Sequence, residues 1–446
     1  MNGAFSAAMR EQFVRIIEYY GQDPYIIRSS SILEDGFGNA FAGKYESVFC
    51  ANRGSLETRL AEFEHAIKVV YASTMSLSAL DYRKRRELDN RDEQMALLIQ
   101  RVSGSYYGSR YMPCAAGVGY SYSPYRVMKD TDPAAGMLRL VMGLGTSAVD
   151  RTEGSYPRIV NLDQPEKTSY SSSADKHKFS QGKAEVIDMA ERTLKRLPLR
   201  EIEPDLPRYL QKILLEHDFD AESRLRETGR FRPVTFISCK GLVENEALMD
   251  QMKRMLHCIQ EEYNYPVDTE FTINISEDGE YSIDLLQCRP LQVLKSETGT
   301  VIPSDIAEEH ILLESRGASM GISGSNLLDT IVLVDPLRYY ELPYKDKDQV
   351  AKLIGKINWH YRDMGRHMML IVPGRVGTSS PELGVPTTFS DISAFEIICE
   401  TEESKVGYNP ELSFGSHIFQ DLVESRILYT AVFRDRKTIH YAPEKL

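Results

Sequence analysis

The strongest constraint on the fold is a pair of alternating apolar and polar runs that an Asp-Gly turn joins. The runs are residues 269–275 and 281–287, and the turn is Glu-Asp-Gly-Glu over residues 277–280. Asp-Gly between alternating runs is a strong signal of an antiparallel β-hairpin. This hairpin would bring Glu270 and Gln287 to the same end of two paired strands, with their side chains converging. A carboxylate and an amide oxygen on rigid strands suit a hard cation such as Mg²⁺.

Groups suited to phosphate binding lie at both ends of the region that this hairpin closes. Residues 28–35 read Arg-Ser-Ser-Ser-Ile-Leu-Glu-Asp, and three glycines lie within residues 34–43. Glycine lets backbone N–H groups approach a ligand closely. Residues 287–290, Gln-Cys-Arg-Pro, add a second guanidinium. Because cations neutralise phosphate oxygens while oxygen ligands hold the metal, this mixture predicts a site for a triphosphate with its magnesium.

The composition is ordinary for a soluble globular protein of two or three domains. The chain has 446 residues, of which 42% are hydrophobic and 26% charged, and its formal net charge is −12. The acidic balance argues against a broad nucleic-acid footprint and against docking on an anionic membrane. No apolar run approaches the roughly 20 residues of a transmembrane helix, and residues 1–5 lack the features of a signal peptide. We therefore expect a cytoplasmic protein that binds neither nucleic acid nor membrane.

The cysteines are scattered along the chain, with no Cys-x-x-Cys pair and no histidine at metal-ligand spacing. Reduced and mostly buried thiols are therefore a better interpretation than a zinc site or disulfides. The six positions are Cys50, Cys114, Cys239, Cys258, Cys288 and Cys399.

Periodicity outlines the elements that precede the hairpin. Residues 4–20 carry an apolar stripe at helical spacing, and a short strand at 24–27 leads into the polar Arg28 segment. A long helix at about 56–86 opens with Ser55. We further expect a buried strand at 95–102 and strands at 117–122 and 138–142, followed by a Gly-Leu-Gly turn at 143–145 that could bend around a ligand. A polar surface loop is expected at 163–182. Helices should then predominate to about 265, and the last of them, at 242–264, has a methionine-rich stripe that we expect in the core.

The pattern changes after Pro290. Residues 296–308 are polar and resemble a linker, and beyond them short strands alternate with helices. Such alternation is typical of an α/β module. We therefore predict a nucleotide-binding region over residues 1–295 and a separate small α/β domain over residues 300–446. Its expected strands cover 330–334, 368–372, 395–399 and 428–433, and its expected helices lie near 347–357 and 417–425.

Six segments occur in a characteristic order: 28–35 with Phe-Ala-Gly at 41–43, Met-Ala-Leu-Leu-Ile-Gln at 95–100, Gly-Val-Gly-Tyr-Ser at 117–121, Gly-Leu-Gly at 143–145, Asp-Thr-Glu at 268–270 and Gln-Cys-Arg-Pro at 287–290. Together they resemble the phosphoenolpyruvate synthase and pyruvate phosphate dikinase N-terminal family, which has the ATP-grasp fold. The resemblance implies an α+β protein in which two ATP-grasp lobes hold the nucleotide, followed by the separate α/β domain. It also implies an ATP-dependent phosphotransferase, or kinase, that uses ATP and Mg²⁺ and acts on an unidentified phosphate acceptor.

The resemblance further implies roles for the matching residues. Arg28 would contact the ATP phosphates and Arg289 would neutralise the phosphate in transfer, which makes both catalytic. Glu270 and Gln287 would hold Mg²⁺. Phosphoryl transfer needs such positioning and charge neutralisation more than covalent help. The remaining implied ATP-binding residues are Gly43 and Ser47, along the triphosphate, and Gln100, near the adenine or ribose.

Departures from the family pattern leave the activity open. The family's Gly-Gly-Lys segment, whose lysine reaches the phosphates, has no match before Arg28. Either the segment was lost or the chain is a fragment of a longer protein with further domains, and we expect the fragment. The phosphohistidine and pyruvate-binding domains have no match either, and the region between Gly145 and Glu270 reads as long and helical. A catalytically impaired ATP-binding regulatory module and an ATP-grasp ligase are the alternatives to a phosphotransferase, and the sequence does not distinguish transfer of the β- from the γ-phosphate.

Two residues of the C-terminal domain are candidates for contacts with the acceptor. Arg375 lies in a Gly/Ser loop at 373–380 that suits a small anion but lacks the Lys-Ser/Thr ending of a P-loop, so a structural turn is the better interpretation. His417 follows Gly-Ser at an expected helix start, where the helix dipole would favour a phosphate. A capping or buried histidine is the commoner explanation. We expect this domain to pack on the ATP lobes and to shape or cover an acceptor site from which water is excluded.

Overall fold

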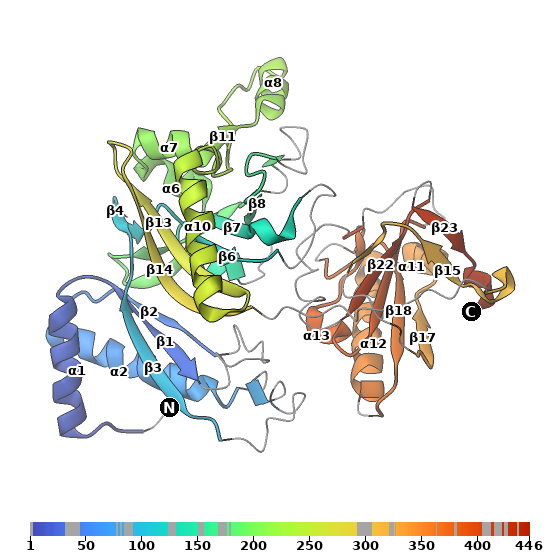
Figure 1. Ribbon diagram of the computed structural model, residues 1–446, viewed down its shortest axis with the longest axis horizontal. Coiled ribbons are helices and arrows are strands. Elements are labelled where there is room, and N and C mark those ends of the chain that lie inside the picture. Colours follow the sequence, from blue (N-terminus) through green and yellow to red (C-terminus); the bar gives the residue numbers. More distant parts are fainter. Residues whose placement is uncertain are drawn as a thin grey trace. The chain divides into compact units, whose positions relative to one another are not determined.

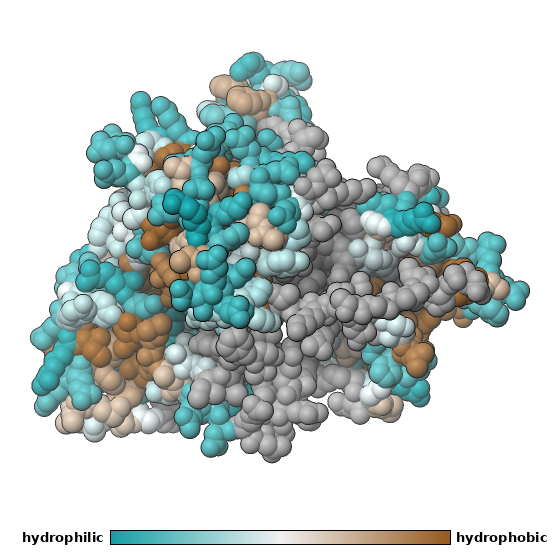
Figure 2. All heavy atoms as spheres, viewed as in Figure 1, coloured by the Kyte–Doolittle hydropathy of each residue, from teal (hydrophilic) through white to brown (hydrophobic). Residues whose placement is uncertain are grey.

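The computed structural model divides the chain into two compact units, Met1–Gln292 and Val293–Leu446. Hydrophilic side chains cover most of the described surface in the view of Figure 2, with smaller apolar areas among them. None of the described helices combines the length and the apolar character needed to cross a membrane. The structure describes residues 3–31, 45–76, 79–80, 83, 92–123, 131–149, 156–167, 176–177, 180–291, 306–320, 325, 327–362, 364–378, 381–403, 412–413, 422, 427–434 and 437–446.

The first unit begins with two helices on one face of a three-stranded antiparallel sheet (Figure 1). The strand order is β2-β1-β3, with β1 at Tyr25–Ser31, β2 at Val48–Cys50 and β3 at Met95–Arg101. The helices are α1 (Ala7–Tyr20) and α2 (Leu56–Ser73). Ser6 and Ser55 cap them by accepting hydrogen bonds from backbone N–H groups of the first turn. The core of this layer contains Ile17, Tyr25, Ile27, Phe63, Ile67 and Val70.

The second sheet of this unit contains the predicted hairpin and has the order β14-β13-β6-β7-β8. Every residue of the central strands β6 and β7 is buried. Strands β6 and β7 approach so closely that a Cβ at Gly117 would lie 2.1 Å from the carbonyl oxygen of Arg139, so only glycine fits there. Leu248, Met252 and Leu256 of the helix α10 pack against the core of this sheet. The bounds are β6 Ala115–Tyr120, β7 Met137–Met142, β8 Arg158–Asn161, β13 Val267–Ile275, β14 Tyr281–Pro290 and α10 Glu246–Tyr263.

A third sheet, of order β10-β9-β5-β4, and several short helices complete the first unit. Gly143 connects it to the second sheet, since Leu144 N–H donates to the carbonyl of Glu185 at 3.0 Å. The bounds are β4 Ser105–Tyr107, β5 Arg110–Met112, β9 Lys183–Asp188, β10 Thr193–Pro198, β11 Leu215–His217, β12 Thr235–Ile237, α4 Thr146–Val149, α6 Leu199–Ile202, α7 Arg208–Leu214, α8 Phe219–Glu227, α9 Lys240–Val243, and the 3-10 turns Pro133–Ala135 and Glu203–Asp205.

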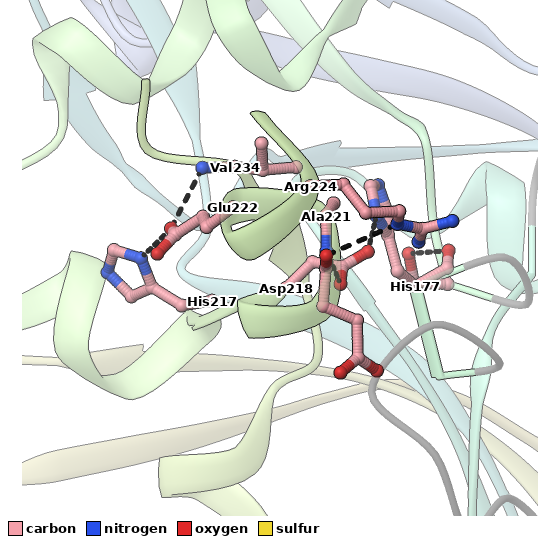
Figure 3. A network of polar contacts seen from close by, with 9 residues as sticks. His177, His217, Asp218, Ala221, Glu222, Arg224 and Val234 are labelled. Atoms are coloured by element: carbon pink, nitrogen blue, oxygen red, sulfur yellow. Dashed lines mark hydrogen bonds and ion pairs between the residues drawn. The ribbon is translucent and has the colours of Figure 1, made fainter. Parts of the chain in front are cut away.

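Two histidine–carboxylate pairs hold the start of α8 (Figure 3). His177 Nδ1 lies 2.7 Å from Asp218 Oδ2, and His217 Nδ1 lies 2.7 Å from Glu222 Oε1. Asp218 also caps the helix, because its Oδ1 accepts the N–H of Ala221 at 2.9 Å. These contacts tie the start of α8, a helix too short to be stable alone, to His177 and to the end of β11.

The second unit is an α/β layer whose sheet has the order β16-β22-β21-β18-β17. Strands β17, β18, β21 and β22 are parallel, and β18 is buried along its whole length, as a central parallel strand should be. The bounds are β15 Leu313–Ser315, β16 Ser319–Met320, β17 Thr330–Leu333, β18 Met368–Pro373, β19 Arg375–Val376, β20 Gly384–Val385, β21 Ile397–Thr401, β22 Leu428–Val432, β23 Thr438–Tyr441, α11 Pro336–Glu341, α12 Tyr344–Arg362, α13 Phe389–Ile392, and the 3-10 turns Glu308–His310 and Pro443–Lys445.

Several sequence-based expectations need correction. The helix expected at 56–86 ends at Ser73. Strand β3 is not buried but alternates between half-buried and exposed residues, because it lies at the edge of its sheet and only one face meets the helices. The region after Gly145 contains the expected helices, of which α10 is the last, but also the strands β8 to β12, which were not expected. Gln181, near the end of the surface loop expected at 163–182, is buried, with 3% of its surface exposed.

Other expectations are confirmed or lie outside the described residues. The strands at 117–122 and 138–142, the hairpin and the apolar face of the helix ending near 264 are all present, within a few residues of the expected bounds. Four of the six cysteines are buried. The linker expected at 296–308 lies mostly outside the described residues, as does the helix expected at 417–425.

Candidate functional site

A cavity of about 380 Å³ in the first unit brings together residues from both ends of its sequence. Its walls come from β1 and the Tyr45–Phe49 stretch, from β3 and the residues after it, from the turn after β7, and from the hairpin β13–β14. Its size is within the usual range for small-molecule sites. Of the residues expected to bind a nucleotide, Arg28, Ser47, Gln100, Glu270, Gln287 and Arg289 line this cavity, and Gly43 lies outside the described residues.

Glu270 and Gln287 are directly opposite each other on the antiparallel strands β13 and β14. The prediction that they sit on adjacent strands with converging side chains is confirmed, because both side chains meet the same nitrogen of Arg28. Arg28 Nη2 donates to Glu270 Oε2 and to Gln287 Oε1, each at 2.6 Å. Arg28 is part of β1, so the polar run after Ile27 continues the strand instead of leaving it. The contact links β1 to the β13–β14 hairpin, two of the segments that line the cavity.

Arg289 lies near the base of the hairpin and pairs with Asp268 on the neighbouring strand. Its Nε donates to Asp268 Oδ1 at 2.7 Å, and the two side chains are 13% and 14% exposed. Burial disfavours the charged guanidinium, but the nearby charges of Asp268 and Glu270 and the Asp268 hydrogen bond outweigh it and raise the pKa of Arg289. Arg289 is therefore a fixed positive charge on the cavity wall.

Gln100 and Ser47 occupy the other walls. The Gln100 Nε2 donates to the carbonyl oxygen of Leu286 at 3.1 Å, beside the irregularity in the β13–β14 register. Gln100 therefore fastens β3 to the hairpin as well as lining the cavity. Ser47 lies just before β2, in the Tyr45–Phe49 stretch.

Sequence patterns did not identify several other lining residues. Ser103 and Thr272 place hydroxyl groups on the wall, and Thr272 is 4% exposed. Thr272 could have been found from the strand period, because residues two apart on a strand share a face and Glu270 was already placed there. Leu144 and its neighbours Gly145 and Thr146 line the cavity, as expected of the Gly-Leu-Gly turn. The apolar part of the wall comes from Ile26, Phe49, Val102 and Leu144.

Glu270 and Gln287 are the residues of the cavity wall expected to hold a metal ion. Among the residues that the structure describes, no group of three or more His, Cys, Asp or Glu side chains is placed to hold one. Glu270 and Gln287 offer two oxygen donors. Such a pair fits Mg²⁺, which usually takes one or two carboxylates from the protein and completes its shell with substrate phosphates and water.

Arg375 and His417, the residues expected to contact the acceptor, belong to the second unit. Arg375 begins β19 and is half-buried, directly after the parallel strand β18. The loop around it is tightly constructed, since a Cβ at Gly384 would lie 2.1 Å from the backbone nitrogen of Arg375. His417 lies outside the described residues.

Comparison with known proteins identifies the first unit. The family model described as the pyruvate phosphate dikinase AMP/ATP-binding domain matches residues 1–310, which is more than half of the chain. This match confirms the resemblance on which the site residues were chosen. No curated protein matches the chain.

Proposed function

The chain belongs to the family of pyruvate phosphate dikinase AMP/ATP-binding domains, and from that premise we propose that it is an ATP-dependent phosphotransferase with an ATP-grasp nucleotide site. The observation that carries the proposal is the convergence of Arg28, Glu270 and Gln287, within 2.6 Å contacts, on the wall of one cavity. Arg289 lines the same cavity from the base of the hairpin. These residues supply the charge neutralisation and oxygen ligands that a nucleoside triphosphate requires.

The two arginines would bind the phosphates. Arg28 uses Nη2 for its contacts with Glu270 and Gln287, and a guanidinium has five N–H donors in a fixed fork. Its remaining donors can therefore reach phosphate oxygens while it stays near the hairpin. Arg289, held by Asp268, would stabilise the negative charge that spreads over the transferring group. Fixed donors of this kind cost little reorganisation during the reaction.

Glu270 and Gln287 are the residues that would hold Mg²⁺ with the nucleotide. The metal would neutralise charge between neighbouring phosphates and fix their orientation. The chain's own contribution is the rigid hairpin, which keeps both oxygen donors on paired strands. Ser47 would lie along the triphosphate, Gln100 near the adenine or ribose, and the apolar wall of Ile26, Phe49, Val102 and Leu144 would suit the base.

Arg375 of the second unit is a proposed contact for the phosphate acceptor. A half-buried arginine after a parallel strand, such as Arg375, suits an anionic group of the acceptor. His417, chosen from the sequence, is the second proposed contact for the acceptor.

The experiment that tests the proposal tracks label from ATP. The protein is incubated with Mg²⁺ and with ATP labelled at the β- or the γ-phosphate, with candidate acceptors and with water alone, and products are separated by thin-layer chromatography. Labelled product or labelled phosphate that depends on Glu270 supports a phosphotransferase, and the labelled position identifies the group transferred. Binding of ATP without any release of label would instead support the regulatory module, and label release only with a carboxylate substrate and an amine would support the ligase.

A further inference from the structure

A second polar cluster, formed by Ser103, Thr272, Asn274 and Asp284, adjoins the cavity through its first two members. Ser103 Oγ donates to Asp284 Oδ2 at 2.6 Å, and Thr272 Oγ1 lies 3.4 Å from the same oxygen. Asn274 Nδ2 donates to Ser103 Oγ at 2.7 Å. Ser103 and Thr272 line the cavity, whereas Asp284 is exposed to solvent and is not among the lining residues. None of these residues belongs to the segments by which the family was recognised.

These contacts fix the direction in which Ser103 can hydrogen-bond. A hydroxyl group has one O–H donor and two acceptor lone pairs. The donor of Ser103 points to the Asp284 carboxylate, and the Asn274 amide occupies one lone pair. One lone pair of Ser103 Oγ therefore remains to accept a hydrogen bond. The Asp284 carboxylate makes this oxygen a stronger acceptor, because it polarises the O–H bond of Ser103. Thr272, whose hydroxyl faces the same carboxylate, also has acceptor capacity left for the cavity.

The position of this cluster along the hairpin indicates which part of a nucleotide it would meet. Thr272 is two residues from Glu270 on β13 and faces Asp284 across the ladder, so the cluster lies about 7 Å from the Glu270–Gln287 pair along the strand. Ser103 directly follows Val102, which belongs to the apolar part of the wall. The cluster therefore adjoins both the residues proposed to bind the phosphates and the apolar part of the wall that would suit the base.

We propose that Ser103 and Thr272, held as acceptors by Asp284, bind the ribose hydroxyl groups of the nucleotide. This inference rests on the proposed ATP site and deepens it. The ribose diol offers two adjacent O–H donors between base and triphosphate, and an acidic residue is a common partner for ribose hydroxyls in nucleotide sites. Asp284 acts here as a positioning residue, because it reaches the cavity through the two hydroxyl groups.

The test compares ATP with 2′,3′-dideoxy-ATP, which keeps the base and the triphosphate but lacks both hydroxyl groups. Dissociation constants are measured by titration calorimetry with Mg²⁺ for the intact chain and for Ser103→Ala, Thr272→Val, Asp284→Ala and Asp284→Asn. The wild type should prefer ATP by about tenfold or more, since a polar site that meets a missing hydroxyl loses its hydrogen bonds. In Ser103→Ala and Asp284→Ala, the ratio of the dissociation constant of 2′,3′-dideoxy-ATP to that of ATP should fall close to one, mainly because ATP binds more weakly. Asp284→Asn should restore part of the preference, because its amide oxygen can still accept from Ser103.

Matched controls are Ser276→Ala and Asp278→Ala, which change the same residue types in the exposed turn of the same hairpin. Both should leave the ratio unchanged, and thermal unfolding should show that all variants fold. An unaltered ratio in Ser103→Ala and Thr272→Val, including an equal loss of both nucleotides, would overturn the ribose assignment. Failure of the wild type to bind either nucleotide would instead refute the ATP site itself, so the two failures are distinguishable.

Discussion

Arg28 and Glu270 lie 242 positions apart in the sequence, yet their side chains meet at 2.6 Å. Both are largely shielded from water, with 15% and 18% of their side-chain surfaces exposed. An enclosed ion pair gains Coulomb energy but loses the hydration of both charges, so it contributes little net stability. Its main effect is to hold the two side chains in fixed positions. Here the pair fixes β1 against the hairpin, and both segments line the cavity.

We expect Glu270→Gln to abolish Mg²⁺-dependent turnover while the protein still folds. The substitution keeps the shape of the side chain and removes the charge that would hold the metal and face Arg28. The loss should be about a hundredfold or more, as for other removals of a charge-stabilising group. Release of labelled phosphate measures the activity, and circular dichroism checks the fold. Glu277→Gln, in the exposed turn of the same hairpin, is the control. Near-normal turnover in Glu270→Gln would place the phosphotransferase site elsewhere.

Arg28→Ala should act mainly on the affinity for ATP. It removes a guanidinium that can make charge-assisted hydrogen bonds to phosphate, and we expect the dissociation constant to rise about 10- to 100-fold. The dissociation constant of Arg28→Lys should lie between those of the wild type and Arg28→Ala. Lysine keeps the positive charge but lacks the guanidinium group that contacts both Glu270 and Gln287. Calorimetric titration with ATP is the measurement. Arg10→Ala, an arginine 53% exposed on α1, should leave the affinity unchanged. ATP binding by Arg28→Ala at wild-type strength would contradict this role.

The hairpin with Glu270 and Gln287 could be predicted because its signals are local. The Asp-Gly turn and the period of two determine both the pairing and the shared face. The contact with Arg28 is not local, and no periodicity in the chain connects β1 to β13. The proposal that Arg28 binds the phosphates came only from the order of the family's segments. Ser103 and Asp284 went unnoticed for the same reason, since their hydrogen bond joins residues 181 positions apart.

The β9–β10 hairpin was missed because its turn lacks the usual residues. Arg192 takes the left-handed conformation, with φ at 59°, where glycine or asparagine would have signalled a turn. Strand β10 also contains Lys195 and Arg196, which made the segment look like a polar helix. The buried alternation of Ala184 and Val186 in β9 was too short to outweigh these features.

The start of α8 should lose stability as the pH falls (Figure 3). Burial raises the pKa of Asp218, but the Ala221 N–H and the His177 contacts outweigh it and lower the pKa below the usual value. The hydrogen bonds from His217 and the Val234 N–H likewise lower the pKa of Glu222. A carboxylate with a lowered folded pKa stabilises above its unfolded pKa and loses this contribution as pH falls through the folded one. The loss should therefore begin below about pH 4.

Hydrogen exchange of residues 218–227 at pH 7, 5 and 3 measures this effect. Asp218→Asn keeps a good helix cap but cannot ionise, so it should flatten the pH dependence, whereas Asp218→Ala should also cost about 1 kcal/mol at neutral pH through the lost cap. Asp220→Asn, an exposed carboxylate on the same helix, is the matched control. An Asp218→Asn profile identical to that of the wild type would show that the His177 pair does not stabilise α8.

Glu400 should be essential for the stability of the second unit. Its side chain is fully buried and accepts hydrogen bonds from Val376 N–H at 2.8 Å, Ser413 N–H at 2.5 Å and the Tyr429 hydroxyl at 2.8 Å. The donors come from three separate parts of the unit, namely β19, the 412–413 stretch and β22. Because Glu400→Ala leaves all three buried without an acceptor, we expect it to destabilise the unit by about 3–5 kcal/mol.

The single tryptophan, Trp359 in α12, allows this prediction to be checked in the second unit alone. Urea unfolding followed by Trp359 fluorescence should shift to lower denaturant in Glu400→Ala. Tyr429→Phe removes one of the three donors, so it should lower the free energy of unfolding by only about 1 kcal/mol. Glu341→Ala, at the exposed end of α11, should unfold with the wild type. Coincident curves for Glu400→Ala and the wild type would mean that the carboxylate contributes nothing to holding the loop of Arg375 on the sheet.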